Sequence, residues 1–249
     1  MDTPLLSVVI PAYNEAERIG PTLRAVTAWL EERRLFPAHE VLVVDDGSTD
    51  ATAATVVELS RELPHVRLVE SRPNRGKGHA VRVGMLEARG DLRVFLDADH
   101  SVSIAQLPRL LDALERGADV AIGSRYVAGA STPRKAPWYR RAWSRLGNAV
   151  VRIGLIDGIL DTQCGFKAFT GAAAEAIFSR AHFCGWGFDI EVIALARALG
   201  LRVVECGVEV HDDRRTRVRP VRDAIGITWE FARIRAAFRN REYDLPKGR

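Results

Sequence analysis

Cysteine is scarce in this chain of 249 residues, which contains three, all far apart in the sequence. Cys164, Cys184 and Cys206 are odd in number and lack the paired spacing of zinc ligands. The sequence therefore shows neither a disulfide framework nor a zinc site. This cysteine pattern is typical of a protein in a reducing compartment such as the cytosol.

Long apolar runs are also missing, although 47% of the residues are hydrophobic. Residues 146–160 come closest, but Arg152 and Asp157 interrupt them, so we expect no membrane-spanning helix. Residues 1–4 lack the basic segment of a signal peptide. Internal repeats and low-complexity segments are absent from the sequence as well. The length suits one sizeable core, and we expect both halves to share one continuous sheet, so the sequence predicts a single domain over residues 1–249.

Charge is unevenly distributed, although the net charge is only +4. Lysine and arginine concentrate in the second half, at Arg134, Lys135, Arg140, Arg141, Arg145 and in residues 214–222. This excess predicts an anionic partner, which could be a phosphate, an anionic membrane surface or nucleic acid. No recognised nucleic-acid-binding module accompanies the basic residues, so we expect no nucleic-acid partner.

Hydrophobic periodicity in the first half alternates short strand-like runs with amphipathic helices. The predicted strands cover residues 6–10, 40–44, 66–69, 92–96 and 120–122, and the predicted helices cover residues 15–34, 51–62, 77–88 and 107–115. This order predicts an α/β fold with a mostly parallel sheet and helices on both faces. Further on, the sequence predicts a helix over 138–156, a strand over 201–210 and a basic helix over 221–239.

Two carboxylates, Asp97 and Asp99, follow the strand predicted over residues 92–96. In an extended chain these two side chains point the same way, and their negative charges repel unless a cation lies between them. Carboxylates are hard oxygen ligands that suit Mg²⁺ or Mn²⁺, and such an ion commonly bridges carboxylates to phosphates. The alternative is that one aspartate caps the next helix and the other is solvated.

Other polar motifs follow the remaining predicted strands, at residues 11–15, 45–48 and 123–125. Ligands of such sheets bind beyond the carboxyl ends of the strands, so we expect these motifs to converge. Residues 45–48 could also form a simple turn. Lys77, in a glycine-flanked loop at a helix start, either binds an anion or is solvated. Arg125 follows a buried strand and is expected to meet a phosphate in bidentate geometry.

The order and spacing of residues 9–15, 43–50, 74–78 and 97–99 resemble the family 2 glycosyltransferases, which have a GT-A fold. Three further motifs, at residues 123–126, 161–167 and 185–191, resemble the polyprenyl-phosphate hexosyltransferases. Within that group they are most similar to the dolichyl-phosphate β-glucosyltransferases. The resemblance covers nearly the whole chain and fades after about Val210.

The resemblance implies a nucleotide-sugar-binding half, residues 1–128, and an acceptor-binding half, residues 129–249. The residues that match nucleotide-sugar-binding positions are Pro11, Tyr13, Glu15, Asp45, Asp46, Lys77 and Asp97. The implied metal ligands are Asp97, Asp99 and Ser101. Ser101 stands where polyprenyl-phosphate mannosyltransferases have a glutamine, and because it is a weaker ligand, water could replace it.

The reaction implied is a metal-dependent, inverting transfer of a hexose to a polyprenyl or dolichyl phosphate, with UDP-glucose favoured as donor. The candidate catalytic residues are Asp99, Arg125 and Asp189. An anionic acceptor needs cations rather than a strong base, and the candidates are Arg134, Lys135, Arg214, Arg215 and Arg217. A hydroxyl acceptor would need a base, for which Asp189 or Glu191 would serve, unless they cap a helix or orient a loop.

Three alternatives stay open at this point. GDP-mannose could be the donor, the acceptor could be a soluble hydroxyl compound, or the protein could be a non-catalytic nucleotide-sugar- or nucleic-acid-binding protein. Aromatics and arginines mix in residues 137–143, which favours an anionic membrane interface, although the same stripe could pack on the sheet. We therefore expect a cytoplasmic protein, peripheral at the inner membrane face. His211 is expected to be structural.

Overall fold

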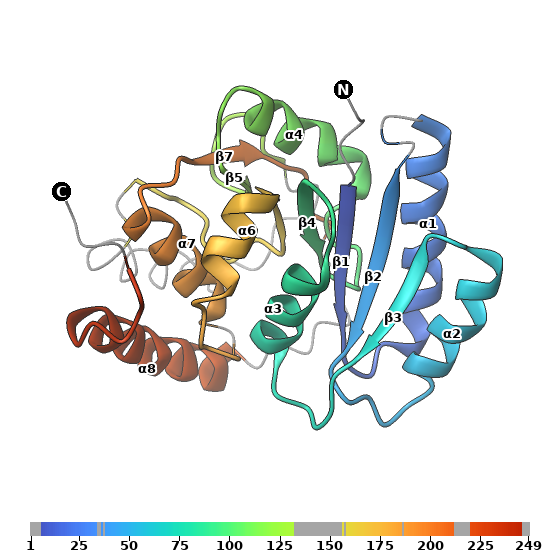
Figure 1. The fold of residues 1–249 in the computed structure, drawn as a ribbon, viewed down its shortest axis with the longest axis horizontal. Coiled ribbons are helices and arrows are strands. Elements are labelled where there is room, and N and C mark those ends of the chain that lie inside the picture. Colours follow the sequence, from blue (N-terminus) through green and yellow to red (C-terminus); the bar gives the residue numbers. More distant parts are fainter. Residues whose placement is uncertain are drawn as a thin grey trace.

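The computed structural model describes residues 6–33, 36, 38–131, 156, 158–185, 187–211 and 220–245. Its strands form one seven-stranded sheet in the order β3-β2-β1-β4-β6-β5-β7 (Figure 1). The strands are β1 (Leu6–Ala12), β2 (His39–Asp45), β3 (Val66–Glu70), β4 (Leu92–Leu96), β5 (Val120–Ser124), β6 (Phe166–Thr170) and β7 (Val203–Gly207). The helices are α1 (Ala16–Arg33), α2 (Thr52–Glu62), α3 (Lys77–Glu87), α4 (Leu107–Glu115), α6 (Gly171–Phe178), α7 (Phe188–Ala198) and α8 (Pro220–Arg239), with a 3₁₀ turn, η1 (Ile104–Gln106).

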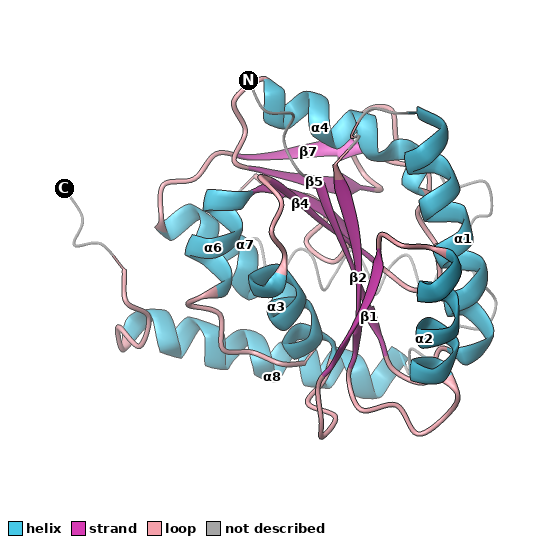
Figure 2. Ribbon diagram, turned by 45° about the vertical axis from the view of Figure 1, so that its right-hand side comes forward, coloured by secondary structure: helices cyan, strands magenta, loops and turns pink. Residues whose placement is uncertain are grey.

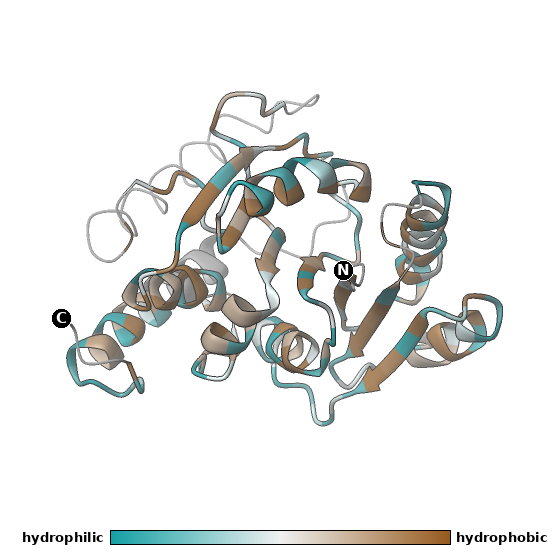
Figure 3. Cartoon of the chain, turned by 45° about the horizontal axis from the view of Figure 1, so that its top comes forward, coloured by the Kyte–Doolittle hydropathy of each residue, from teal (hydrophilic) through white to brown (hydrophobic). Residues whose placement is uncertain are grey.

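Helices cover both faces of the sheet, as the sequence predicts. One buried cluster joins α1, α2 and α4 to side chains on one face of the strands, and a second joins α3, α6, α7 and α8 to the other face. Figure 2 shows the sheet running between these two groups, and Figure 3 shows strands that are largely hydrophobic. Strands covered on both faces read as continuous apolar runs, which is why β1 and β2 were visible in the sequence.

Strand β6 is the exception to the parallel order, and the sequence did not predict it. It pairs antiparallel with β4, where Leu96 lies opposite Phe166, and antiparallel with β5 on its other side. Because β6 runs in the opposite direction, its first residues lie at the carboxyl end of β4. The loop that enters β6 therefore reaches the same sheet edge as Asp97.

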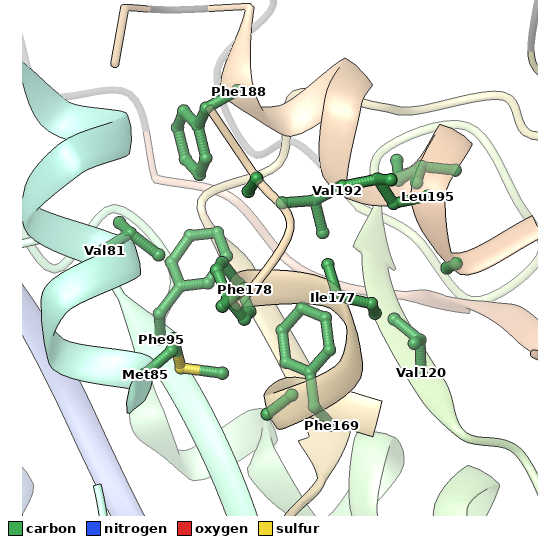
Figure 4. Close-up of a cluster of buried hydrophobic side chains, with 14 of the residues drawn as sticks. Val81, Met85, Phe95, Val120, Phe169, Ile177, Phe178, Phe188, Val192 and Leu195 are labelled. Atoms are coloured by element: carbon green, nitrogen blue, oxygen red, sulfur yellow. The ribbon is translucent and has the colours of Figure 1, made fainter. Parts of the chain in front are cut away.

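Aromatic side chains bind β4 and β6 to the helices above them (Figure 4). The ring centroids of Phe95 and Phe188 are 5.9 Å apart, and those of Phe169 and Phe178 are 5.4 Å apart in an edge-to-face arrangement. Burial of each such ring contributes about 1.5–3 kcal/mol. Phe188 begins α7, so this packing fixes the start of α7 against β4.

The late elements differ in extent from the prediction. Strand β7 is shorter than the predicted 201–210, and α8 begins one residue before the predicted 221. Residues 138–155, with the predicted helical stripe, lie outside the described residues. So do the predicted acceptor-phosphate ligands Arg134, Lys135, Arg214, Arg215 and Arg217. Within the described ranges, no helix has the length and apolar character that a membrane crossing requires.

Candidate active site

A cavity of about 410 Å³ lies at the carboxyl ends of β1 to β4. Six of the predicted nucleotide-sugar-binding residues line it, namely Pro11, Tyr13, Glu15, Asp46, Lys77 and Asp97. Asp99 also lines it, together with Arg18, Asn74, Gly76 and Gly185. The predicted convergence of the strand-end motifs is therefore present in the structure. Asp45, Ser101, Arg125 and Asp189 are not among the lining residues.

Asn14 joins the turns that follow β1 and β2. Its backbone is in the left-handed region, with φ of 55°, which asparagine tolerates better than most residues. Its side-chain oxygen accepts a hydrogen bond from the Thr49 amide at 2.8 Å, and its amide donates to the Ser48 hydroxyl at 2.9 Å. These bonds hold Tyr13 at the cavity, where 41% of the residue is exposed. Tyr13 thus lines the cavity with an aromatic ring, the kind of side chain that packs against flat ligands.

Asp45 and Asp46 both organise backbone. The fully buried Asp45 accepts a hydrogen bond from the Ser48 amide at 3.3 Å and closes the turn after β2. The Asp46 carboxylate accepts from the amides of Arg75 at 3.1 Å and Gly76 at 2.6 Å. Asp46 therefore fixes the loop before α3, and its remaining surface borders the cavity. The sequence treated the two aspartates alike, whereas the structure brings one of them to the cavity.

Two glycines allow the start of α3 to lie against the loop before α7. A Cβ on Gly76, whose φ is 105°, would lie 2.6 Å from the carbonyl oxygen of Cys184. The Gly78 amide donates to the same oxygen at 2.8 Å, and a Cβ on Gly78 would lie 2.5 Å from Phe188. Larger residues would separate the two segments, which places Lys77 at the first position of α3 and at the cavity wall.

Lys77 forms an ion pair with Asp97 in the cavity wall, with 2.6 Å between Nζ and Oδ1. Burial alone would lower the pKa of Lys77, but the negative charges of Asp97, Asp189 and Asp99 raise it above the ordinary value. The side chain is therefore cationic at neutral pH. The sequence left open whether Lys77 is solvated, and the structure places it among carboxylates.

Asp97 has room for its carboxylate because residue 165 is glycine. A Cβ on Gly165 would lie 1.9 Å from Oδ2 of Asp97, so any larger residue would force this carboxylate to move. Asp99 accepts a hydrogen bond from the Ser101 amide at 3.0 Å, and the Ser101 carbonyl accepts from the His211 amide at 2.8 Å. This contact brings His211, which was expected to be structural, beside the aspartate loop.

The donor set at this end of the cavity fits Mg²⁺ or Mn²⁺. Asp97 and Asp99 offer hard carboxylate oxygens to the same cavity, and an ammonium group already neutralises one of them. Within the part of the chain that the structure describes, no group of three His, Cys, Asp or Glu side chains could hold a metal. A metal at this site would therefore depend on ligand oxygens, as Mg²⁺ sites on phosphates commonly do.

Arg125 is held by a buried carboxylate that sequence reasoning missed. Its Nε and Nη2 atoms donate to Oδ2 and Oδ1 of Asp161 at 2.7 and 2.8 Å. Asp161 is fully buried, and its own amide donates to Glu205 of β7 at 2.9 Å. Burial opposes both charges, but the pairing raises the pKa of Arg125 and lowers that of Asp161. A phosphate would meet only the other edge of this guanidinium group.

Asp189 lies behind the cavity wall and pairs with the fully buried Lys167 of β6. The Lys167 ammonium also donates to the carbonyl of Cys164 at 2.6 Å and lies 5.0 Å from the centroid of the Phe95 ring. Burial raises the pKa of Asp189, and the nearby charges of Lys167 and Lys77 oppose that rise. The carboxylate proposed as a base for a hydroxyl acceptor is thus engaged by a buried lysine.

Glu191, the other candidate base, holds the loop before α7. Its carboxylate accepts from the amides of His182 at 2.8 Å and Phe183 at 3.0 Å, and from the Tyr243 hydroxyl at 2.7 Å. Burial raises the pKa of Glu191, and these three donors partly offset the rise. Glu191 therefore has a structural task, since the loop it holds carries Gly185 to the cavity.

Comparison with known sequences identifies relatives over most of the chain. Residues 7–178 match the profile of the family described as "Glycosyl transferase family 2". The chain is 34% identical over 250 residues to the dolichyl-phosphate beta-glucosyltransferase of Saccharomyces cerevisiae, covering 94% of this chain and 75% of that protein. A dolichyl-phosphate beta-glucosyltransferase of Trichomonas vaginalis is 37% identical over 212 residues, covering 81% of this chain. This chain spans only 62% of that second relative's length.

Comparison with solved structures identifies the same fold. The glucosyl-3-phosphoglycerate synthase of Mycobacterium tuberculosis, solved with Mn²⁺, UDP and phosphoglyceric acid, superposes with a TM-score of 0.68. The two chains are 20% identical, and the match covers 98% of this chain and 80% of that one. The seven-stranded sheet is thus the GT-A architecture predicted from the sequence. From its profile match, its relatives and its fold, this chain belongs to glycosyl transferase family 2.

Proposed function

We propose that this protein transfers a hexose, with glucose favoured, from a nucleotide sugar, with UDP-glucose favoured, to a polyprenyl or dolichyl phosphate. The observation that carries the proposal is the cavity in which two neighbouring carboxylates, Asp97 and Asp99, face a lysine at a helix start. Carboxylates suit a divalent cation, and a cation at a helix N-terminus suits a diphosphate. The names of the relatives favour the sugar and the lipid acceptor.

The cavity residues would bind the donor in order along its length. Tyr13, exposed beside Pro11, would contact the flat base, and the turns closed by Asp45 and Asp46 would flank the base and ribose. Lys77 would contact a diphosphate oxygen. Asp97 and Asp99 would hold Mg²⁺ or Mn²⁺, which would neutralise charge on the departing nucleoside diphosphate.

The acceptor proposed here is an anion, so it needs no strong base. A phosphate oxygen would form a bond to the anomeric carbon while the bond from that carbon to the diphosphate breaks, with inversion at the carbon. Asp189 and Glu191 support this reading because both are engaged by internal partners, Lys167 for the first and backbone amides for the second. Arg125, held by two hydrogen bonds to Asp161, would present the other edge of its guanidinium to the acceptor phosphate.

The proposal includes the predicted ligands of the acceptor phosphate, namely Arg134, Lys135, Arg214, Arg215 and Arg217. It also includes an anionic membrane surface as a partner. A lipid acceptor requires the protein to work at a membrane, and we place it at the cytoplasmic, inner face as a peripheral protein. Basic side chains near anionic headgroups would attract the protein there, and salt would weaken this attraction.

The deciding experiment measures transfer from a panel of nucleotide sugars, with Mn²⁺ and a short polyprenyl phosphate, and with soluble hydroxyl compounds as competing acceptors. The expected result is glucose transfer to the lipid phosphate with release of UDP. Transfer from GDP-mannose alone would change the donor to the mannosyl alternative. Transfer only to a hydroxyl compound would overturn the lipid acceptor, and nucleotide binding without transfer to any acceptor would overturn the enzyme assignment.

A further inference from the structure

Lys77 forms an ion pair with Asp97, one of the two carboxylates proposed to hold a divalent cation. The ammonium lies 2.6 Å from Oδ1 of Asp97, which is shorter than an ordinary hydrogen bond from nitrogen to oxygen. The ammonium also lies 5.9 Å from the centroid of the Phe188 ring. A metal that takes Oδ1 of Asp97 would therefore displace a cation that is already there.

The pair between Lys77 and Asp97 is more exposed to the cavity than the pair between Lys167 and Asp189. The side chains of Lys77 and Asp97 are 20% and 25% exposed, whereas those of Lys167 and Asp189 are 0% and 3% exposed. When the partly exposed pair separates, water or a ligand in the cavity can replace each partner. Breaking the buried pair would instead leave an uncompensated charge in the interior.

The charges around Lys77 favour the joint arrival of two ligands. A divalent cation alone would have to release Lys77 from Asp97 and then remain beside its positive charge. A diphosphate alone would approach the carboxylates of Asp97 and Asp99. When both arrive together, the ammonium can turn to the diphosphate and the metal can take the carboxylates, so that every charge faces an opposite one.

We propose that Lys77 acts as an internal competitor at the metal site, which excludes a lone divalent cation and admits one that arrives with a nucleoside diphosphate. The inference rests on the proposed function, because it assumes a metal and a diphosphate in this cavity. It adds a coupling between the two ligands that depends on one side chain. Since such coupling is reciprocal, the diphosphate must strengthen metal binding by the same factor that the metal strengthens diphosphate binding.

The test measures Mn²⁺ binding directly, from the electron paramagnetic resonance signal of the free ion, with and without UDP. The proteins are the wild type, the charge-free variants Lys77→Met and Lys77→Gln, and the charge-conserving control Lys77→Arg. Both charge-free variants should bind Mn²⁺ alone at least about tenfold more tightly than the wild type, a change of about 1.4 kcal/mol. The effect of UDP on Mn²⁺ affinity should shrink in both, and Lys77→Arg should keep the wild-type pattern.

Two results distinguish a failure of the competitor role from a failure of the proposed function. If the wild type binds Mn²⁺ more tightly with UDP, but neither charge-free variant binds Mn²⁺ alone more tightly, the competitor role is overturned and the proposed site stands. If the wild type binds no Mn²⁺ even with UDP or GDP, the metal site and the competitor role both fail. Using two substitutions protects the test against a single variant that folds poorly.

Discussion

The first and second halves of the molecule treat their charged residues differently. In the first half, the turns after the strands leave Asp97, Asp99 and Lys77 partly exposed at the cavity. In the second half, Lys167 and Asp189 pair with each other in the interior, and the buried Asp161 pairs with Arg125 at the end of the first half. Exposed charges are available to ligands, and buried pairs hold the structure in place.

This difference separates two tasks that the sequence motifs presented as one. The motifs of both halves resemble those of the same enzymes, so the sequence offers catalytic candidates in both halves. The structure assigns Glu191 to a loop and Asp189 to an internal pair, while the carboxylates after β4 remain open to the cavity. Mutations of the open carboxylates should therefore reduce ligand binding, whereas mutations of the internal pairs should reduce stability.

The largest effect is expected at the open aspartate. Asp99→Ala should reduce transfer by several kcal/mol of transition-state stabilisation, about 10³-fold or more, because the metal loses a ligand. It should also remove the Mn²⁺ dependence of UDP binding without lowering the melting temperature. Asp112→Ala, which alters an exposed aspartate of α4, is the matched control and should change neither quantity. Full activity of Asp99→Ala in the presence of a chelator would refute the metal assignment.

Asp189→Asn should act on stability instead. It leaves the Lys167 charge buried without its counter-ion, which should cost about 3–5 kcal/mol in the free energy of unfolding. Urea unfolding measures this loss. Glu62→Gln is the control, because its pair with Arg24 is exposed on both sides and should contribute less than about 1 kcal/mol.

The opposite outcome for Asp189→Asn would change the mechanism. Wild-type unfolding with lost transfer would mean that Asp189 contacts the substrate, and a hydroxyl acceptor with Asp189 as its base would then be the better account.

Arg125→Lys tests a residue between the two regions. Lysine keeps the charge but cannot form the bidentate pair with Asp161, so transfer should fall about thirtyfold, or about 2 kcal/mol. UDP affinity should stay unchanged, because Arg125 does not line the cavity. Single-turnover transfer and UDP titration measure the two quantities, with the exposed Arg116→Lys as control. A parallel fall in UDP affinity would place Arg125 on the nucleotide instead.

The pH midpoint of acid unfolding is a second quantity that Arg125→Lys should change. Pairing with Arg125 lowers the pKa of Asp161, so the pair contributes stability above the unfolded pKa near 3.8 and loses it as pH falls through the lowered value. The weaker lysine pair should depress this pKa less. The variant should therefore unfold at a higher pH than the wild type in an acid titration, and an unchanged midpoint would show that the pair adds no stability.

The smallest effect is expected at Tyr243. Tyr243→Phe removes one hydrogen bond to Glu191 but leaves the bonds from two backbone amides, so it should cost about 1–2 kcal/mol. This corresponds to a melting temperature about 2–8 °C lower for a domain of this size. Ser60→Ala, at a partly exposed position of α2, is the control. A loss of UDP affinity larger than the loss of stability would show that the loop before α7 contacts the donor.

The first half was predictable because its strands are apolar runs that end in polar turns. All five strands and four helices expected there occur in the structure, although β1, β2, β3 and β5 extend beyond their predicted ends. The turns could be located from the sequence, but their internal bonds could not. Asp45 and Asp46 are neighbours of the same type, and only the folded loop before α3 distinguishes the buried one from the one at the cavity.

The second half was less predictable because its signals depend on distant partners. Strand β6 has a lysine at its second position, which disguises a buried strand, and its counter-ion Asp189 comes 22 residues later. Gly165 is required by the carboxylate of Asp97, a contact that no local pattern indicates. Asp161 was visible only as part of a motif, since its partner Arg125 lies 36 residues earlier in the chain.

The reversed strand β6 also determines when the site can form during folding. Its contacts with β4 join residues about 70 positions apart, because Leu96 pairs with Phe166 and Leu92 with Thr170. Contacts of such long range form late, since a long loop must close before they stabilise anything. As the chain leaves the ribosome, Asp97 emerges long before Gly165. Until β6 has been synthesised, the edge of β4 that pairs with it has no partner. A nascent first half is therefore exposed to wrong pairing at that edge until β6 arrives to close the sheet.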